Sequence, residues 1–143
     1  MTPIEKDTDL VCRHLGALDG ALAQLRRHLG RPLELLSTDI DERWAVERGL
    51  QICAQNCIDI ATHISASAGN SPHDYGSAID ALVPMGVLDP AFAARFRAVA
   101  GFRNLLVHGY LEVDLARMHQ ILNQRFDDFI EFAAQIRRSL GAS

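Results

Sequence analysis

The stretch at residues 39–64, DIDERWAVERGLQICAQNCIDIATHI, predicts a long amphipathic helix. Thr38 or Asp39 can cap its amino end, and acidic residues follow in the first turn, where the helix dipole favours them. Apolar and small side chains then recur about every three or four residues. They are Trp44, Val46, Leu50, Cys53, Cys57, Ile60, Ala61 and Ile64. One face of this helix is therefore expected to pack against other helices.

The same helical spacing continues on both sides of this stretch. The predicted segments are residues 5–29, residues 74–84 behind Ser71 and Pro72, residues 90–108 behind Asp89, and residues 115–136 behind Asp114. Short connections join them, and no segment has the alternation typical of a strand. The pattern predicts an all-α fold, a four- to five-helix up-and-down bundle.

The composition is typical of a globular protein. The chain has 143 residues, of which 48% are hydrophobic and 22% charged, so we expect one domain over residues 1–143. The polar, acidic start does not resemble a signal peptide, and no apolar run approaches the ~20 residues of a membrane span. We expect a cytoplasmic protein that does not associate with membranes. A net charge of −4 argues against nonspecific coating of nucleic acid but allows a local phosphate site.

The three cysteines are Cys12, Cys53 and Cys57. An odd number without a C-x-x-C pair fits a reducing compartment. Cys53 and Cys57 share a helical face and could bind a soft metal, but no second set of cysteines or histidines follows at zinc-site spacing. We interpret the pair as small core residues, and we expect neither a metal nor another cofactor.

Residues 102–110, FRNLLVHGY, bring three reactive side chains close together in the chain. Arg103, His108 and Tyr110 have the spacing R-x4-H-x-Y around Gly109, which permits a change of direction. In one unbroken helix, Arg103 and His108 would lie about 140° apart around the axis. The two side chains could meet if the helix breaks near Gly109, or if two copies of the chain face one another.

Such a set can cleave RNA without a metal. Histidine can deprotonate the ribose 2′-hydroxyl or protonate the leaving 5′-oxygen, and arginine can stabilise charge on the phosphate. Tyrosine can position the phosphate or stack on a base. One histidine cannot serve as both acid and base in the same turnover, whereas a dimer offers two. A histidine near a helix end is also commonly a cap or a surface residue, so the motif alone leaves a structural role open.

The motif resembles the active-site signature of the HepT-like toxins of the HEPN superfamily. In that signature a polar residue follows the arginine, and here it is Asn104. The resemblance extends to residues 44–61, to residues 74–82 with the Gly-Val-Leu at 86–88, and to the Val-Asp at 113–114. It therefore covers nearly the whole chain.

The resemblance implies a homodimer acting as a metal-independent endoribonuclease, the toxin of a type VII (HEPN/MNT) toxin–antitoxin system. Arg103, His108 and Tyr110 would be catalytic, and the substrate would be tRNA or mRNA. It also implies a partner, an MntA-like minimal nucleotidyltransferase antitoxin that transfers AMP from ATP to Tyr110. Asn104 and Asp59 are expected to support the site. Asn104 would orient a neighbour, and Asp59 would hydrogen-bond Arg103 or His108.

Two other classes of function compete with the ribonuclease. One is a noncatalytic helical dimer that only binds a nucleotidyltransferase. The other is an accessory nucleotide-binding domain for an aminoglycoside-type nucleotidyltransferase, which has a related helical architecture. The joint presence of Arg103, His108 and Tyr110 favours the ribonuclease, because neither a scaffold nor an accessory domain needs all three.

Overall fold

The structure is a computed structural model that describes the backbone of residues 3–108 and 114–141 and the side chains of residues 8–103 and 114–141. Its elements are α1 (Pro3–Leu25), the 3-10 turn η1 (Arg26–His28), α2 (Glu34–Thr38), α3 (Ile40–Ser67), α4 (Tyr75–Ala81), α5 (Pro90–Phe96), α6 (Val99–His108) and α7 (Leu115–Gly141). The described residues form helices and turns and include no strand, which confirms the all-α class. None of the helices described combines the length and the apolar character needed to cross a membrane.

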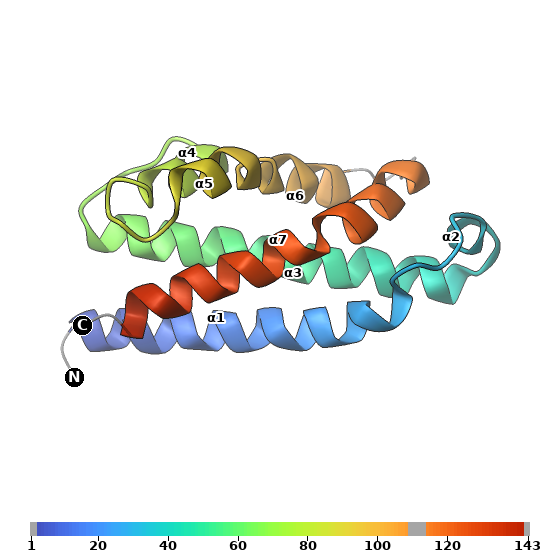
Figure 1. Cartoon of the computed structure of the whole chain (residues 1–143), viewed down its shortest axis with the longest axis horizontal. Coiled ribbons are helices and arrows are strands. Elements are labelled where there is room, and N and C mark those ends of the chain that lie inside the picture. The colour runs from blue at the N-terminus through green and yellow to red at the C-terminus, as the bar shows by residue number, and fades with distance from the viewer. Residues whose placement is uncertain (1–2, 109–113, 142–143) are drawn as a thin grey trace.

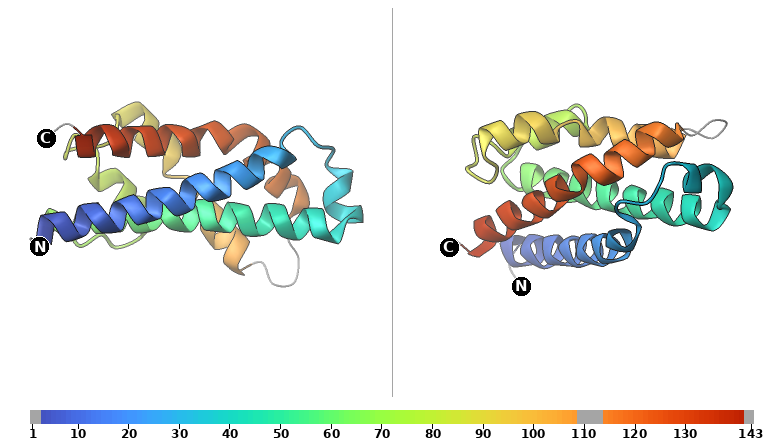
Figure 2. Two further views of the ribbon diagram at one scale, coloured as in Figure 1. Left: turned by 90° about the horizontal axis from the view of Figure 1, so that it is seen from below. Right: turned by 45° about the vertical axis from the view of Figure 1, so that its right-hand side comes forward.

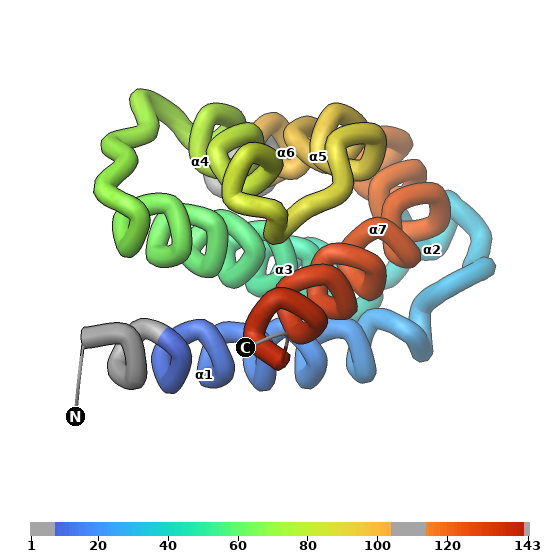
Figure 3. The backbone as a smooth tube through the Cα atoms, turned by 60° about the vertical axis from the view of Figure 1, so that its left-hand side comes forward, coloured from blue at the N-terminus to red at the C-terminus, as the bar shows by residue number. Residues whose placement is uncertain are grey.

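The helices form four antiparallel arms, as the up-and-down prediction requires (Figure 1). Three arms are the long helices α1, α3 and α7, and the remaining arm is assembled from α4, α5 and α6. In Figure 3, α7 runs obliquely across the bundle, between α1 on one side and the α4–α6 arm on the other. The beginning of α1 and the end of α7 lie at the same end of the molecule in both views of Figure 2.

The central element is α3, which contacts α1, α2, α4, α6 and α7. Its start is confirmed, because the Asp39 carboxylate accepts the backbone N–H groups of Asp41 and Glu42 at 3.0 and 3.2 Å. The predicted inner face is confirmed by side chains that are at most 1% exposed, namely Val46, Leu50, Cys53, Cys57, Ile60 and Ala61.

Trp44 departs from this pattern. The apolar spacing included it in the set, but its side chain is 63% exposed. Trp44 and Val46 lie about 200° apart around a helix, so both cannot face the core of a bundle that covers only one side of α3 at this point. The helix was predicted correctly, but Trp44 does not belong to its buried face.

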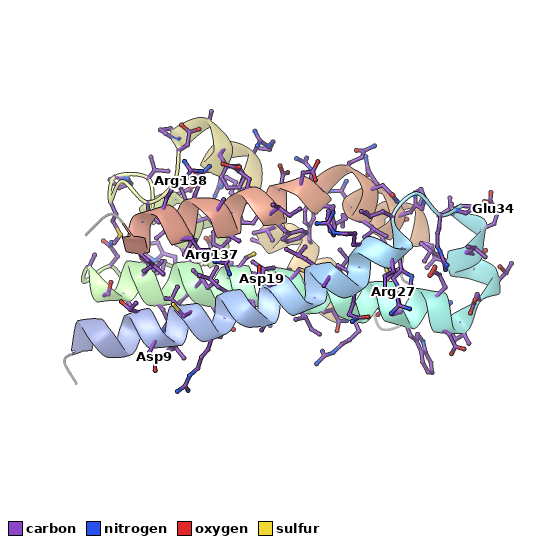
Figure 4. The ribbon with its side chains drawn as sticks, turned by 60° about the horizontal axis from the view of Figure 1, so that its bottom comes forward. Asp9, Asp19, Arg27, Glu34, Arg137 and Arg138 are labelled. Atoms are coloured by element: carbon purple, nitrogen blue, oxygen red, sulfur yellow. The ribbon has the colours of Figure 1, made fainter. Side chains whose placement is uncertain are left out.

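Close contacts hold α1 against its two neighbours. On the α3 side, Gly49 allows the helices to approach, because a Cβ atom there would lie 2.6 Å from Cδ2 of Leu25. On the α7 side, Arg137 donates to Asp19, with 2.6 Å between Nη2 and Oδ2, and Figure 4 shows the two side chains on adjacent helices. Both contacts join residues that are distant in sequence.

The arm formed by α4, α5 and α6 differs most from the prediction. The first of these helices begins at Tyr75, because the Asp74 carboxylate caps it by accepting the N–H of Ser77 at 2.7 Å. The N–H of Ser77 also lowers the pKa of Asp74 from its ordinary value. The predicted start at residue 74 is therefore confirmed to within one residue, whereas the predicted cap by Ser71 and Pro72 was wrong. For α5 the predicted cap is confirmed, since Asp89 accepts the N–H of Phe92 at 3.1 Å.

The helix predicted over residues 90–108 is in fact two helices. A turn at residues 97–98 separates α5 from α6. The physical reason is that the two halves pack on different partners. Phe96 of α5 stacks on Phe132 of α7, with ring centroids 4.8 Å apart, whereas α6 packs against α3. One straight helix could not serve both contacts.

A buried acidic residue stabilises the connection between α1 and α3. Glu42 is 5% exposed, and its carboxylate accepts hydrogen bonds from Nδ1 of His28 and from Nη1 of Arg31. The backbone carbonyl of Arg31 is in turn hydrogen-bonded to His119 of α7 at 2.9 Å. The sequence had suggested for Glu42 only a role as a first-turn acid. The unpredicted helix α2 lies within this connection.

The cysteine prediction is confirmed for the buried pair. Cys53 and Cys57 are both free and fully buried in the hydrophobic core, while Cys12 is exposed on α1. Burial raises the pKa of Cys53 to about 12 and also raises that of Cys57, where the neighbouring Cys53 adds to the effect. These thiols stay protonated and behave as small apolar side chains.

Candidate active site

The R-x4-H-x-Y motif lies on α6 and on the segment that follows it. Arg103 is described in full and is half-buried. The backbone of Asn104 and His108 belongs to α6, but their side chains lie outside the described residues. Tyr110 lies outside the described residues altogether. The geometry of the site is therefore built from Arg103.

The helix α6 is continuous from Val99 to His108. Positions 103 and 108 thus lie about 140° apart around its axis and about 7.5 Å apart along it. Between these two positions the helix does not change direction. A break at Gly109, the first of the two ways in which these residues could converge, lies outside the described residues. The other way, a second copy of the chain facing the first, is compatible with this helix.

Arg103 is held by side chains from two other helices. Its Nε donates to Oε1 of Gln55 on α3 at 3.0 Å. Its Cζ also lies 5.2 Å from the centre of the Tyr75 ring, at the start of α4. The ring face therefore supports the guanidinium through a cation–π contact. Three helices, α3, α4 and α6, meet at this one side chain.

Asp59 reaches Arg103 only indirectly. Its Oδ1 accepts a hydrogen bond from Nε2 of Gln55 at 2.9 Å. The amide of Gln55 therefore lies between the carboxylate and the guanidinium. In the described part of the chain no direct bond joins Asp59 to Arg103, because Gln55 lies between them. A bond to His108 falls outside the described side chains.

Sequence reasoning missed both contacts of Arg103. Gln55 precedes Asp59 by one helical turn and so shares its face, which was a usable signal. Tyr75 stands in a segment that resembles the family, but nothing local pointed it toward Arg103. The position of Tyr75 depends on the Asp74 cap that starts α4.

A second arginine adds positive charge near the motif. Arg117 of α7 lies over the ring of Phe102, with its Cζ 5.4 Å from the ring centre. Phe102 is buried and immediately precedes Arg103, so α6 presents its apolar side to the bundle at this point. Arg103 and Arg117 thus place two positive charges beside Phe102, in a chain whose net charge is −4.

The family model for ribonuclease HepT-like proteins matches residues 18–136, a span that includes α6 and the whole motif. The chain belongs to the ribonuclease HepT-like family. This confirms the resemblance drawn from the motif and from the helices around it. A HepT-like relative, the mRNA nuclease HepT of Shewanella oneidensis, is 27% identical over 89 residues, which are 62% of this chain and 67% of the relative.

Solved structures share the fold. A tri-AMPylated HEPN toxin of Shewanella oneidensis in complex with its MNT antitoxin superposes with a TM-score of 0.78 at 22% identity, covering 90% of this chain and 97% of the toxin. The cytosolic protein YutE of Bacillus subtilis, whose function is unknown, gives a TM-score of 0.81 at 18% identity, with 95% and 92% covered. At these identities the likeness establishes the HepT-like helical arrangement.

Proposed function

We propose that this chain is the toxin of a type VII (HEPN/MNT) toxin–antitoxin pair and that it cleaves RNA without a metal. The observation that carries the proposal is the family match across residues 18–136, which contains Arg103, His108 and Tyr110 in the R-x4-H-x-Y order. A relative named mRNA nuclease HepT supports RNA as the substrate. The site residues proposed here are Arg103, His108 and Tyr110, supported by Asn104.

In the proposed reaction, the ribose 2′-oxygen attacks the neighbouring phosphorus, and the bond from phosphorus to the 5′-oxygen breaks. One His108 takes the proton from the 2′-hydroxyl, and a second gives a proton to the leaving 5′-oxygen. Arg103 stabilises the charge that builds on the phosphate, and Tyr110 positions it. Because His108 is the last residue of α6, the helix dipole favours its charged form and hence the acid role.

A homodimer supplies the second histidine of this proposal. The continuous helix α6 keeps Arg103 and His108 of one chain on different sides. A two-fold axis beside α6 would place Arg103 of one chain near His108 of the other. We propose that the two motifs share one cleft in this way.

The proposed partner is an MntA-like minimal nucleotidyltransferase that transfers AMP from ATP to Tyr110. An MNT antitoxin is bound to the AMPylated HEPN toxin of Shewanella oneidensis, which supports the same arrangement here. A charged, bulky adduct next to Arg103 and His108 would occupy the phosphate site and repel RNA.

Expression of the chain alone is expected to arrest bacterial growth and to yield RNA cleavage by the purified protein. Arg103→Ala should lower the cleavage rate by about 10²- to 10³-fold, because it removes a charge that stabilises the transition state. His108→Ala should lower it by about 10²- to 10⁴-fold through loss of acid–base catalysis. The measurement is the initial rate on single-stranded RNA, together with growth after induction.

Arg13→Ala is the matched control for these variants. Arg13 is an exposed arginine of α1, paired with Asp9 at 3.6 Å, and its loss should leave growth arrest and cleavage unchanged. Full toxicity in both the Arg103 and the His108 variants would refute the active site. It would favour the noncatalytic dimer that only binds a nucleotidyltransferase.

Co-expression with the nucleotidyltransferase is expected to add adenylyl groups to the peptide that contains Tyr110. The chain has two tyrosines, so Tyr75→Phe and Tyr110→Phe together assign the modification. Tyr110→Phe should abolish the added mass, whereas Tyr75→Phe should keep it, because Tyr75 is half-buried against Arg103. Mass spectrometry of the digested protein measures both. Neutralised toxicity with unmodified Tyr110 would instead indicate inhibition by binding.

A further inference from the structure

We propose that Gln55 is the positioning residue of Arg103 and that Asp59 fixes the direction of the Gln55 amide. The inference rests on the proposed function, because it concerns how Arg103 is presented to phosphate. Its basis is the chain of hydrogen bonds from Asp59 through Gln55 to Arg103, at 2.9 and 3.0 Å.

The direction of the amide follows from the chemistry of its two partners. A carboxylate can only accept hydrogen bonds, and a guanidinium can only donate them. Nε2 of Gln55 must therefore point to Asp59, and Oε1 must point to Arg103. The reversed amide would set oxygen against oxygen and nitrogen against nitrogen. Asp59 thus selects the one orientation in which Gln55 can hold Arg103.

The bond to Gln55 uses Nε and does not involve the two terminal nitrogens of the guanidinium. Within the part of the chain that the structure describes, Nη1 and Nη2 of Arg103 make no hydrogen bond to protein. These two nitrogens form the fork that binds phosphate oxygens in a bidentate manner. The Tyr75 ring covers one face of the guanidinium. A rotation of the guanidinium would therefore break either the hydrogen bond to Gln55 or the contact with this ring.

A neutral partner also preserves the charge of Arg103. Other arginines of the described chain are ion-paired with carboxylates; they are Arg13, Arg31, Arg95, Arg97, Arg125, Arg137 and Arg138. A carboxylate in direct contact would neutralise Arg103 and compete with phosphate. The amide of Gln55 holds Arg103 with one hydrogen bond and keeps the acid one side chain away.

The pair differs from the surface contacts between arginine and glutamine elsewhere in the protein. Arg27 donates to Gln24 at 3.2 Å, but those residues are three positions apart and exposed. Arg103 and Gln55 are 48 positions apart, half-buried, and on different helices. Gln24→Leu is therefore a matched control that removes the same kind of bond where no site is proposed.

The test compares variants of the full-length chain in multiple-turnover cleavage of a single-stranded RNA oligonucleotide. Gln55→Leu is expected to lower kcat by about 10- to 100-fold, because Arg103 loses its direction in the transition state. The KM should change by less than about threefold, since the charge that attracts RNA remains. Gln24→Leu should leave both constants unchanged. Thermal unfolding of each variant verifies that it is folded.

Variants that keep the size of the side chain separate positioning from packing. Q55E sets a second carboxylate against Asp59 and brings a negative charge to Arg103, so it should lower kcat as much as Gln55→Leu does. D59N lets the Gln55 amide take either direction and should lower kcat by about two- to fivefold. If Gln55→Leu or Q55E changes kcat by less than about twofold, the positioning role is overturned, and an unchanged kcat in D59N overturns the role of Asp59.

Failure of the proposed function is distinguishable from failure of this inference. If the wild-type chain does not cleave RNA, the ribonuclease proposal fails. The hydrogen bond to Arg103 is then read from the Nε–H signal of Arg103 in an NMR spectrum, assigned with Arg103→Ala. Gln55→Leu should shift that signal and speed exchange of the proton with water, whereas Gln24→Leu should leave it in place. An unchanged Arg103 signal in Gln55→Leu would overturn the inference.

Discussion

Pairing one wild-type chain with one His108→Ala chain is expected to lower RNA cleavage by about 10²- to 10⁴-fold, because the proposed reaction uses both histidines of the dimer. The continuous helix α6 separates Arg103 and His108 of one chain by about 140°, which favours a site drawn from both subunits. The mixed dimer has a single His108, which cannot serve as both acid and base in the same turnover.

The two chains are co-expressed with different tags, and dimers carrying both tags are purified, so that every dimer assayed is mixed. A wild-type chain paired with an Arg13→Ala chain is the control, because both histidines remain. Cleavage at about half the wild-type rate by the dimer of wild-type and His108→Ala chains would show that each chain carries a complete site.

Phe96→Ala is expected to lower the free energy of unfolding by about 3–5 kcal/mol. Phe96 is 3% exposed and lies at the centre of a ring cluster. Its ring centroid is 5.0 Å from that of Phe92, 4.8 Å from that of Phe132 and 6.0 Å from that of Phe129. Truncation would leave a cavity between α5 and α7, where the rings of α7 cannot collapse inward.

Urea unfolding followed by circular dichroism, at one fixed protein concentration, measures this loss. Phe96→Leu is the control, since it keeps most of the apolar volume and should cost about 1–1.5 kcal/mol. A loss below about 1 kcal/mol for Phe96→Ala would contradict the packing of α5 on α7. The same variant should reduce RNA cleavage only through unfolding, because Phe96 packs on the rings of Phe92, Phe129 and Phe132.

Helices were predictable from the sequence where one long face is apolar. In α1, residues Val11, Leu15, Leu18, Leu22 and Leu25 recur at helical spacing, and each is at most 6% exposed. The caps Asp39 and Asp89 were also predictable, because capping involves only neighbouring residues. Prediction was weakest in the arm of α4, α5 and α6. Each of those helices is short, and its limits depend on which long helix it packs against.

Part of the candidate site was predictable from the sequence, and part was not. Arg103, Asn104, His108 and Tyr110 were found from spacing and family resemblance, and the match over residues 18–136 confirms that family. Gln55 and Tyr75 could not be chosen in advance, because many polar residues share the surfaces of α3 and α4. Only the docking of α6 on α3 selected Gln55 as the partner of Arg103.

By itself, then, the sequence determined the helical class, the apolar faces of the three long helices and the family, since periodicity, caps and motifs are local properties of the chain. The tertiary structure alone decided three things. It exposed Trp44, it broke the helix between α5 and α6, and it placed the Gln55 amide between Asp59 and Arg103. Each depends on which helix lies opposite a given face. Contacts between residues far apart in the chain, such as the 48 positions between Gln55 and Arg103, carry that information.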